Sequence, residues 1–192
     1  MTKVGITGGI GSGKSFVSKI LRSMNYPVFN SDSEAKKIIQ ENKEVREDLI
    51  ALFGEETFSN NELNKAFLAN IIFNDNEALE KVNAIVHPKV RQAFEAFAKI
   101  ENNSVVFNEA AILFESGGHS QLDKVILISA PMKLRLQRVM NRDHSTEKEV
   151  LARMNKQWTD EQKRELADFE IINDEQQPLV HQIEEVLMKL KY

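Results

Sequence analysis

A glycine-rich segment near the N-terminus constrains the fold of this chain more than any other feature. Residues 8–15 read GGIGSGKS, which matches the pattern G-x-x-x-x-G-K-[ST] and adds two glycines inside it. A short apolar run precedes it at 3–7, and apolar side chains at helical spacing follow it over 15–24. A strand, a glycine loop and a helix in this order predict a phosphate-binding loop with its ligand at the helix N-terminus. The flanking pattern argues against the alternative, a flexible glycine linker.

The residue types of this loop predict the phosphates of a nucleoside triphosphate as its ligand. Glycines let successive backbone N–H groups point inward at a β-phosphate, where larger side chains would block the approach. Lys14 is expected to reach the β- and γ-phosphates, and the Ser15 hydroxyl is expected to bind magnesium.

Length and composition narrow the class of protein further. At 192 residues the chain is expected to form one domain, with room for a small appended lobe. It has no cysteine, which excludes a disulfide framework, a thiolate metal site and a cysteine nucleophile. The net charge of −4 argues against general attraction to nucleic acid or to anionic membranes. Because no segment resembles a membrane span or a signal peptide, we expect a cytoplasmic enzyme.

Short apolar segments separated by helical segments predict an α/β fold with a five-stranded parallel sheet and helices on both faces. The expected strands are 3–7, 26–29, 104–107, 124–128 and 169–172. The expected helices are 15–24, 63–73, 77–100, 132–141, 147–156 and 177–190. Thr146 with Glu149 and Thr159 with Gln162 are candidate capping boxes. The connection between the second and third strands is too long for one crossover helix, so it predicts an inserted helical lobe over 33–103.

Carboxylates follow two of the predicted strands, at the sheet edge where ligands of parallel sheets bind. Asp32 is a candidate to orient or deprotonate an acceptor hydroxyl, and the alternative is an N-cap for the next helix. Glu109 is placed to face Mg²⁺, directly or through a water, or else is a loop carboxylate without a ligand. For Glu115, a contact to a sugar or amide and a solvated loop position are equally open. Residues 112–114 suit either the core or the apolar wall of a pocket.

Three arginines, Arg135, Arg138 and Arg142, lie along one face of a predicted helix because they are three and four residues apart. Arginines opposite a phosphate loop can neutralise a phosphoryl group in transfer and close over it as a lid, expected here over 138–158. A solvated basic face is the alternative.

His87 and Pro88 fall inside a predicted helix of the inserted lobe. A proline at mid-helix is expected to kink or restart the helix, because it lacks an N–H and its ring clashes with the preceding turn. The histidine lies among apolar neighbours and is most simply a packing residue, with a ligand contact as the secondary possibility.

The order and spacing of these motifs resemble the dephospho-CoA kinases of coenzyme A biosynthesis over nearly the whole chain. The shared segments are GITGGIGSGKS at 5–15, NSD at 30–32, HP at 87–88, ILFE at 112–115, QRVMNRD at 137–143, RMNKQ at 153–157 and ADFEIIN at 167–173. The resemblance implies phosphorylation of the ribose 3′-hydroxyl of dephospho-CoA, with ATP and Mg²⁺ required. It also implies a sheet of the P-loop nucleotide-kinase type with a helical substrate lobe and a lid.

The resemblance also implies roles for the matching residues. Asp32 would take or orient the proton of the 3′-hydroxyl, while Lys14, Arg138 and Arg142 would hold the phosphates. Asn173 would lie near adenine. The other nucleotide contacts would come from Gly9, Ile10, Gly11, Ser12, Gly13, Ser15 and Phe16. The acceptor pocket would be lined by Asp32, His87, Leu113 and Glu115.

The sequence departs from the family pattern near the metal. The family usually has Asp where Asn30 stands, and Asp followed two residues later by Pro where Glu109 and Ala111 stand. Ser15 and Glu109 remain the expected metal positions. Because Glu is one methylene longer than Asp, a direct contact between Glu109 and Mg²⁺ stays open.

Two other functions are compatible with the loop. A kinase for nucleosides or nucleoside monophosphates would share the loop, the lid and the sheet, although His87 and the segment 112–115 favour dephospho-CoA. A nucleotide-dependent switch protein is the more distant alternative. A GTPase of that kind would need N-K-x-D, and residues 155–158, NKQW, lack the aspartate.

Overall fold

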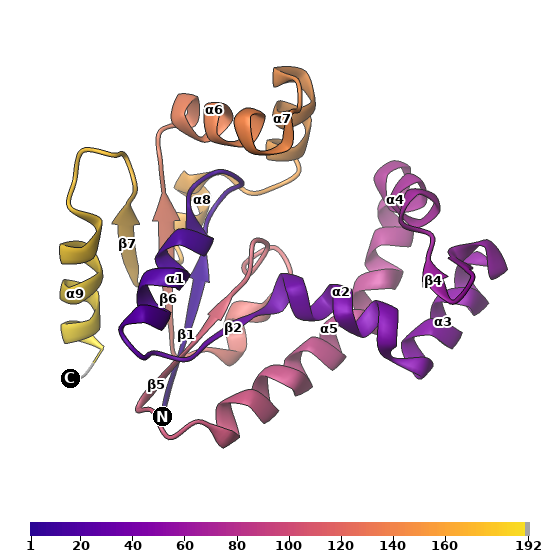
Figure 1. Ribbon diagram of the computed structural model, residues 1–192, viewed down its shortest axis with the longest axis horizontal. Coiled ribbons are helices and arrows are strands. Elements are labelled where there is room, and N and C mark those ends of the chain that lie inside the picture. The colour runs from indigo at the N-terminus through magenta and orange to yellow at the C-terminus, as the bar shows by residue number, and fades with distance from the viewer. Residues whose placement is uncertain (191–192) are drawn as a thin grey trace. The chain divides into compact units, whose positions relative to one another are not determined.

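The computed structural model describes residues 1–190 and divides into two compact units (Figure 1). The first unit is formed by Met1–Asn30 and by the chain from Glu101 onward, and the second is Ser31–Ile100. None of the helices within residues 1–190 combines the length and the apolar character needed to cross a membrane.

The first unit is built on a five-stranded parallel sheet. The strands lie side by side in the order β2 (Val28–Asn30), β5 (Val105–Glu109), β1 (Thr2–Thr7), β6 (Lys124–Ser129) and β7 (Phe169–Ile172). The central strand is buried on both faces, as in parallel sheets covered by helices, because its last four residues, which alternate between the faces, are all buried. The predicted α/β fold with five parallel strands is confirmed.

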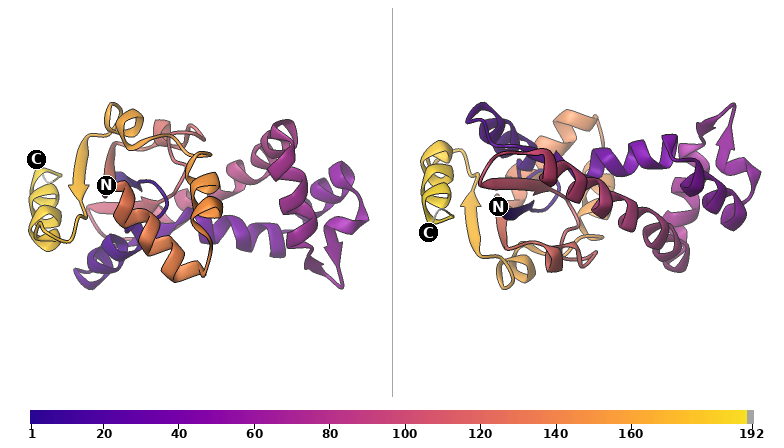
Figure 2. Two further views of the ribbon diagram at one scale, coloured as in Figure 1. Left: turned by 90° about the horizontal axis from the view of Figure 1, so that it is seen from above. Right: turned by 90° about the horizontal axis from the view of Figure 1, so that it is seen from below.

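Helices and a loop segment cover the two faces of this sheet. The helices are α1 (Lys14–Ser23), α6 (Met132–Asp143), α7 (Glu147–Met154), α8 (Asp160–Arg164) and α9 (Leu179–Lys189), with a 3-10 turn, η2, at Gly118–Gln121. Val17 of α1 and Ile183 of α9 pack in one cluster on one face of the sheet. On the other face Val125 of β6 packs with Leu113 and Phe114, which follow β5. Figure 2 shows α1 and α8 on opposite sides of the sheet.

The carboxyl ends of the strands are the edge that matters for function. Figure 1 shows α6 and α7 beyond this edge, while the loop after β1 leads directly into α1. Both predicted capping boxes are present: Thr146 with Glu149 begins α7, and Thr159 with Gln162 begins α8. These caps fix where the chain turns as it comes back from α6 toward β7.

The second unit is mostly helical. Its elements are α2 (Ser31–Glu41), α3 (Lys43–Phe53), η1 (Glu55–Thr57), β3 (Phe58–Ser59), β4 (Glu62–Leu63), α4 (Lys65–Asn74) and α5 (Asn76–Ile100). The antiparallel pair β3–β4 turns at Asn60 and Asn61, both with positive φ, as two-residue hairpin turns require. The sequence expectations include neither α3 nor this hairpin. The insertion predicted over 33–103 overlaps the unit, and its role in substrate binding stays a prediction.

Helix α5 runs through Pro88 without restarting, contrary to one of the two outcomes expected at that residue. Its buried face continues on both sides of the proline, from Val82 and Val86 to Val90 and Phe94. The spacing of four residues keeps these side chains on one stripe. Packing of this stripe offsets the backbone hydrogen bond that proline cannot make.

Candidate active site

The segment after β1 forms the predicted loop, and its last glycine begins α1. Gly13 has a left-handed φ of +98°, and its carbonyl accepts hydrogen bonds from the N–H groups of Phe16 and Val17 at 2.9 and 3.1 Å. A side chain at Gly13 would be strained and would also collide with the amide of Asn173. The loop therefore delivers its ligand to the N-terminus of a helix, where anions are stabilised.

Three consecutive carbonyls of this loop accept hydrogen bonds from side chains elsewhere in the first unit. In chain order the pairs are Ile10 O with Arg135 Nε at 3.0 Å, Gly11 O with Arg138 Nη1 at 3.4 Å, and Ser12 O with Asn173 Nδ2 at 2.9 Å. In a trans peptide the C=O and the N–H point in opposite directions. Holding the carbonyls of Ile10 and Ser12 therefore turns the N–H groups of Gly11 and Gly13 away from these side chains, as a phosphate-binding loop requires, whereas the Ser12 N–H donates to Gly9 O at 3.1 Å.

The Lys14 ammonium lies against the beginning of the same loop. Its Nζ donates hydrogen bonds to Gly8 O at 2.8 Å and to Gly9 O at 3.3 Å. The loop thus carries a positive charge at the place where the motif requires one. The contact of Lys14 with the β- and γ-phosphates stays a prediction.

Ser15, Asn30 and Glu109 meet at the carboxyl edge of the sheet. The Ser15 hydroxyl donates to Glu109 Oε1 at 2.7 Å, and the Asn30 amide donates to Glu109 Oε2 at 3.0 Å. The register of the strands explains the second contact, because Asn30 and Glu109 are direct partners on β2 and β5. Glu109 is 2% exposed, so both of its oxygens are buried with partners.

This cluster has the chemistry of a magnesium site that is completed by a ligand. Magnesium prefers oxygen ligands and is usually bound by one or two protein groups together with waters and substrate phosphates. A hydroxyl and a carboxylate oxygen converge here within hydrogen-bond distance. In residues 1–190 no three His, Cys, Asp or Glu side chains gather into an all-protein metal cage. The residues present therefore fit a metal that arrives with the nucleotide.

Arg138 and Asn173 lie together beside the loop. Arg138 Nη2 donates to Asn173 O at 3.2 Å and to Glu175 Oε1 at 2.8 Å. Asn173 is fixed at the end of β7, where its N–H donates to Ser129 O at 2.8 Å. The structure thus brings two of the predicted nucleotide-binding side chains to the loop. The place of adenine near Asn173 stays a prediction.

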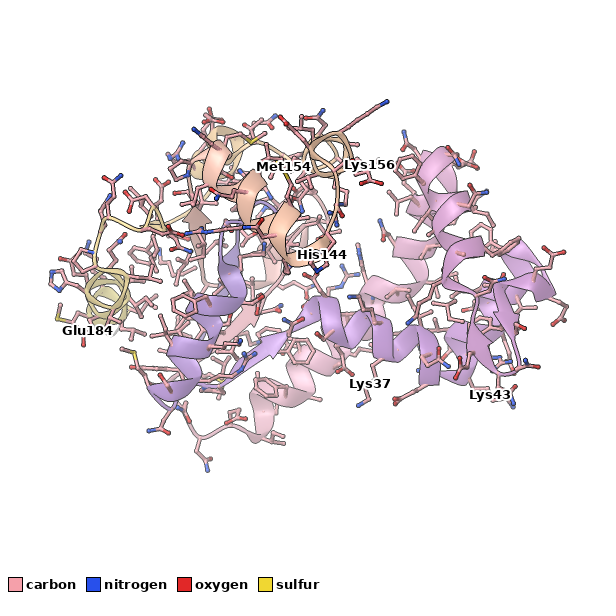
Figure 3. The ribbon with its side chains drawn as sticks, turned by 45° about the horizontal axis from the view of Figure 1, so that its top comes forward. Lys37, Lys43, His144, Met154, Lys156 and Glu184 are labelled. Carbon is pink, nitrogen blue, oxygen red and sulfur yellow. The ribbon has the colours of Figure 1, made fainter. Side chains whose placement is uncertain are left out.

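Arg142 lies at the other end of α6 and is largely exposed. Its Nε and Nη2 donate to the carboxylate of Asp143 at 2.7 and 3.1 Å, and Arg153 Nη1 donates to the same carboxylate at 2.9 Å. These hydrogen bonds, first from Arg142 and then from Arg153, hold the pKa of Asp143 well below its usual range. His144 then ends α6 in a left-handed conformation (Figure 3). The predicted contact of Arg142 with phosphate and the lid over 138–158 stay predictions.

The segment after β5 contains two of the predicted acceptor residues. Leu113 is 2% exposed and packs against Phe114, so it is part of the core of this unit. Glu115 Oε1 accepts hydrogen bonds from the Lys163 ammonium at 2.9 Å and from the Trp158 N–H at 3.0 Å. Lys163 is 0% exposed, and nothing in its sequence context distinguishes it from a surface lysine. A pocket role for Leu113 and Glu115 stays a prediction.

The remaining candidates, Asp32 and His87, belong to the second unit. Asp32 lies in the first turn of α2, where a carboxylate also interacts favourably with the helix dipole. His87 lies in the middle of α5, and burial, followed by the nearby charge of Arg91, lowers its pKa. Because α2 begins at Ser31, Asp32 lies within the helix and is not the N-cap that the sequence offered as the alternative. Its role toward the acceptor stays a prediction. For His87, packing and a ligand contact are both compatible with its place in α5.

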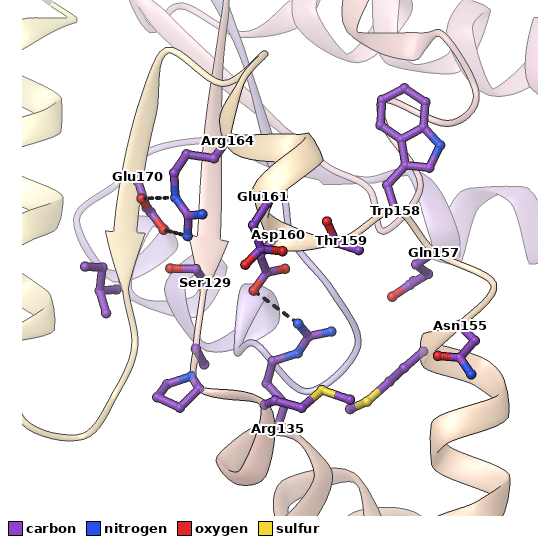
Figure 4. Close-up of a pocket in the computed structure, with 15 residues that line it drawn as sticks. Ser129, Arg135, Asn155, Gln157, Trp158, Thr159, Asp160, Glu161, Arg164 and Glu170 are labelled. Atoms are coloured by element: carbon purple, nitrogen blue, oxygen red, sulfur yellow. Dashed lines mark hydrogen bonds and ion pairs between the residues drawn. The ribbon is translucent and has the colours of Figure 1, made fainter.

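A cavity of about 720 Å³ lies in the first unit where α6, the end of α7 and α8 meet (Figure 4). Its lining includes Arg135, whose Nη1 pairs with Asp160 Oδ2 at 3.1 Å, and Gln157, whose Oε1 accepts the Ile10 N–H at 2.8 Å. Sequence reasoning assigned no role to Gln157 or Asp160. The signal for Gln157 was its place at the end of the RMNKQ segment.

Comparison with known proteins supports the resemblance. The family model for dephospho-CoA kinase matches residues 2–178. A dephospho-CoA kinase of Bacteroides fragilis is 41% identical over 186 residues, covering 96% of this chain and 91% of the relative. One of Thermus thermophilus is 41% identical over 171 residues, covering 88% and 82%. The predicted family and the predicted kinase class are confirmed.

Solved structures agree with this result. A protein from Thermus thermophilus superimposes with a TM-score of 0.85 at 37% identity, covering 98% of this chain and 95% of that one. A dephospho-CoA kinase from Campylobacter jejuni superimposes with a TM-score of 0.68 at 29% identity, covering 98% of this chain and 95% of that one. A shikimate kinase from Bacteroides thetaiotaomicron superimposes with a TM-score of 0.54 at 15% identity, which shows a shared fold alone.

Proposed function

The chain belongs to the dephospho-CoA kinase family, and we propose that it transfers the γ-phosphoryl group of ATP to the ribose 3′-hydroxyl of dephospho-CoA. The products are ADP and coenzyme A. The observation that carries this function is the family match over residues 2–178, which spans the phosphate loop and the whole second unit. A loop with its carbonyls held outward supplies the matching donor site.

The donor half of the reaction relies on positioning and charge. Phosphoryl transfer passes through a loose transition state in which negative charge spreads over the phosphoryl oxygens. The inward N–H groups of the loop bind these oxygens, and Lys14 exchanges the carbonyls of Gly8 and Gly9 for the β- and γ-phosphates. Because the loop is already held in shape, little reorganisation opposes the reaction.

Ser15 and Glu109 are the residues that would hold Mg²⁺. The Ser15 hydroxyl contributes an oxygen ligand, and Glu109 accepts a hydrogen bond from a bound water or contacts the metal itself. When bound, the metal neutralises charge on the β- and γ-phosphates. Asn30 keeps the Glu109 carboxylate oriented through its amide.

Arg138 and Arg142 would neutralise the phosphates from α6. Arg138 already lies against the loop at Gly11. Arg142 is paired with Asp143, so it has to exchange one anionic partner for another when it binds phosphate. Such an exchange couples the end of α6 to the presence of nucleotide, as expected of a lid that excludes water.

The second unit would supply the acceptor side. Asp32 orients the 3′-hydroxyl and accepts its proton late, because a carboxylate with a pKa of about 4 is a poor base for an alcohol. His87 of the second unit, and Leu113 and Glu115 of the first, stay the residues predicted for the acceptor. Of the Glu115 oxygens, Oε2 is buried with no hydrogen-bond partner among residues 1–190.

A panel of acceptors tests this function. ADP release is measured with dephospho-CoA, nucleosides and nucleoside monophosphates, and we expect dephospho-CoA to give by far the largest kcat/KM. A nucleoside monophosphate that outperforms it would replace the proposed acceptor.

Asp32→Asn tests the acceptor role in the same assay. We expect kcat to fall by about 10²-fold or more while the dissociation constant for ATP stays within about twofold, because the change removes a proton acceptor and not a phosphate contact. Asp48→Asn, at an exposed position on α3, is the matched control and should leave both values unchanged. Unchanged turnover in D32N would remove Asp32 from the mechanism.

The cytoplasmic location and the lack of nucleic-acid and membrane partners stay predictions.

A further inference from the structure

The peptide groups on either side of Ile10 are each held by a side chain from a distant part of the chain. The Ile10 N–H donates to Gln157 Oε1 at 2.8 Å, and the Ile10 carbonyl accepts from Arg135 Nε at 3.0 Å. The first contact fixes the Gly9–Ile10 peptide, and the second fixes the Ile10–Gly11 peptide. Two successive planes of the phosphate loop therefore take their orientation from residues that lie behind it.

Packing behind the loop explains why Arg135 is held so firmly. Its side chain is 10% exposed and pairs with Asp160, which is 11% exposed. A Cβ at Gly9 would collide with the Arg135 guanidinium, so the loop and this arginine are in direct contact. The sequence alone attributes this glycine to the approach of phosphate, whereas the structure assigns it to the packing of Arg135.

Gln157 lies in the short segment that returns from α7 to α8. Its own N–H donates to Met154 O, at the end of α7, at 3.0 Å. The N–H of the next residue, Trp158, donates to Glu115, and Asp160 begins α8 (Figure 4). This segment is thus fixed at both ends. It presents the Gln157 amide to the loop with little freedom to move.

We propose that Gln157 is a positioning residue for nucleotide binding, which acts by holding the Ile10 N–H on the outer side of the phosphate loop. The inference rests on the proposed function only in requiring that the loop binds ATP. Without the Gln157 acceptor, the Gly9–Ile10 peptide can rotate. Its carbonyl, which accepts hydrogen bonds from the Ser12 N–H and from Lys14, then leaves the position that shapes the loop. Loss of the Gln157 acceptor should therefore weaken phosphate binding and leave the fold intact.

Three variants test the proposal by equilibrium titration with ATP and, separately, with dephospho-CoA. Gln157→Met keeps the side-chain volume but removes the acceptor, and we expect about tenfold weaker ATP binding, the worth of one well-placed hydrogen bond. Binding of dephospho-CoA should change by less than about twofold, and the melting temperature by only a few degrees. Gln121→Met, at an exposed position of η2, is the control and should match the parent.

Gln157→Glu provides the rescue. It keeps an acceptor oxygen for the Ile10 N–H, and in about 1 M salt, which weakens the repulsion between its added charge and ATP, it should bind ATP at least about threefold more tightly than Q157M. The proposal is overturned if Q157M binds ATP like the parent, if it loses dephospho-CoA binding equally, if it fails to fold, or if Q157E gives no recovery. Failure of the parent to bind dephospho-CoA would instead count against the proposed function, and the ATP comparison would stand.

Discussion

The charged side chains behind the phosphate loop and those at the turn between α6 and α7 are of the same types but are used differently. Behind the loop lie two ion pairs, Arg135–Asp160 and Lys163–Glu115, which together we call the anchor region. Both pairs are buried or nearly so. At the turn, Arg142 is 63% exposed and pairs with the residue next to it, Asp143. The anchor region joins residues far apart in the chain, whereas the turn is held by its own neighbours.

This difference in burial distinguishes ion pairs that are costly to break from ion pairs that a ligand can replace. Breaking a buried pair leaves an uncompensated charge at a cost of several kcal/mol, so we expect the anchor region to stay in place when ligands bind. An exposed pair contributes little, and a competing anion can replace one partner cheaply. The loop therefore rests on contacts that do not change. For Arg142, on the same helix as Arg135, we expect the exposed pair to be exchangeable for the predicted contact with phosphate.

The largest expected effect comes from breaking the anchor region at Lys163. Lys163→Met keeps most of the side-chain volume but leaves the Glu115 carboxylate without its countercharge, so we expect a loss of about 3–5 kcal/mol in the free energy of unfolding. Urea denaturation measures it. Lys124→Met removes the exposed pair with Asp168 and should cost about 1 kcal/mol or less. Equal losses in the two variants would show that burial does not distinguish the pairs.

An intermediate effect comes from removing the same helix cap in each region. Thr146→Ala and Thr159→Ala both delete a capping box, and each should lower the free energy of unfolding by about 1 kcal/mol. Only T159A should also weaken ATP binding, by about threefold, because α8 is five residues long and begins with Asp160, the partner of Arg135. If T146A weakened ATP binding as much, the anchor region would have no special link to the loop.

The sequence predicted the phosphate loop and most of the sheet unit around it because the sequence patterns for these features are local. A glycine motif between a strand and a helix, apolar runs for parallel strands and two capping boxes each depend on neighbouring residues, and the structure contains all of them. Arg138 came first from its helical spacing with two other arginines and Asn173 from family resemblance, whereas their contacts with the loop carbonyls depend on tertiary structure.

What the sequence could not predict depends on contacts between distant residues. Gln157 reaches the loop across 147 positions, and Lys163 reaches Ala111 across 52. The RMNKQ segment marks Gln157 but assigns it no role, and no local pattern distinguishes Lys163 from a surface residue. The sequence predicted a helical segment over 77–100, and α5 spans it; only the restart expected at Pro88 was wrong, since the propensity rule at that residue is outweighed by the packing of the helix face on both sides.

The smallest expected effect lies at the turn and depends on pH. The hydrogen bonds from Arg142 and Arg153 hold the pKa of Asp143 below its usual range, so the stabilisation is present above the unfolded value of about 3.9. It is lost only as the pH falls through the folded value. Asp143→Asn should therefore lower the melting temperature slightly. The difference in melting temperature between parent and variant, the gap, should be the same at about pH 8 and pH 5 and should narrow below about pH 4. Asp48→Asn, exposed on α3, should show no comparable gap. A gap that closed between pH 8 and pH 5 would mean that Asp143 titrates near neutrality, so that the turn could not persist as a self-paired cluster under the conditions of catalysis.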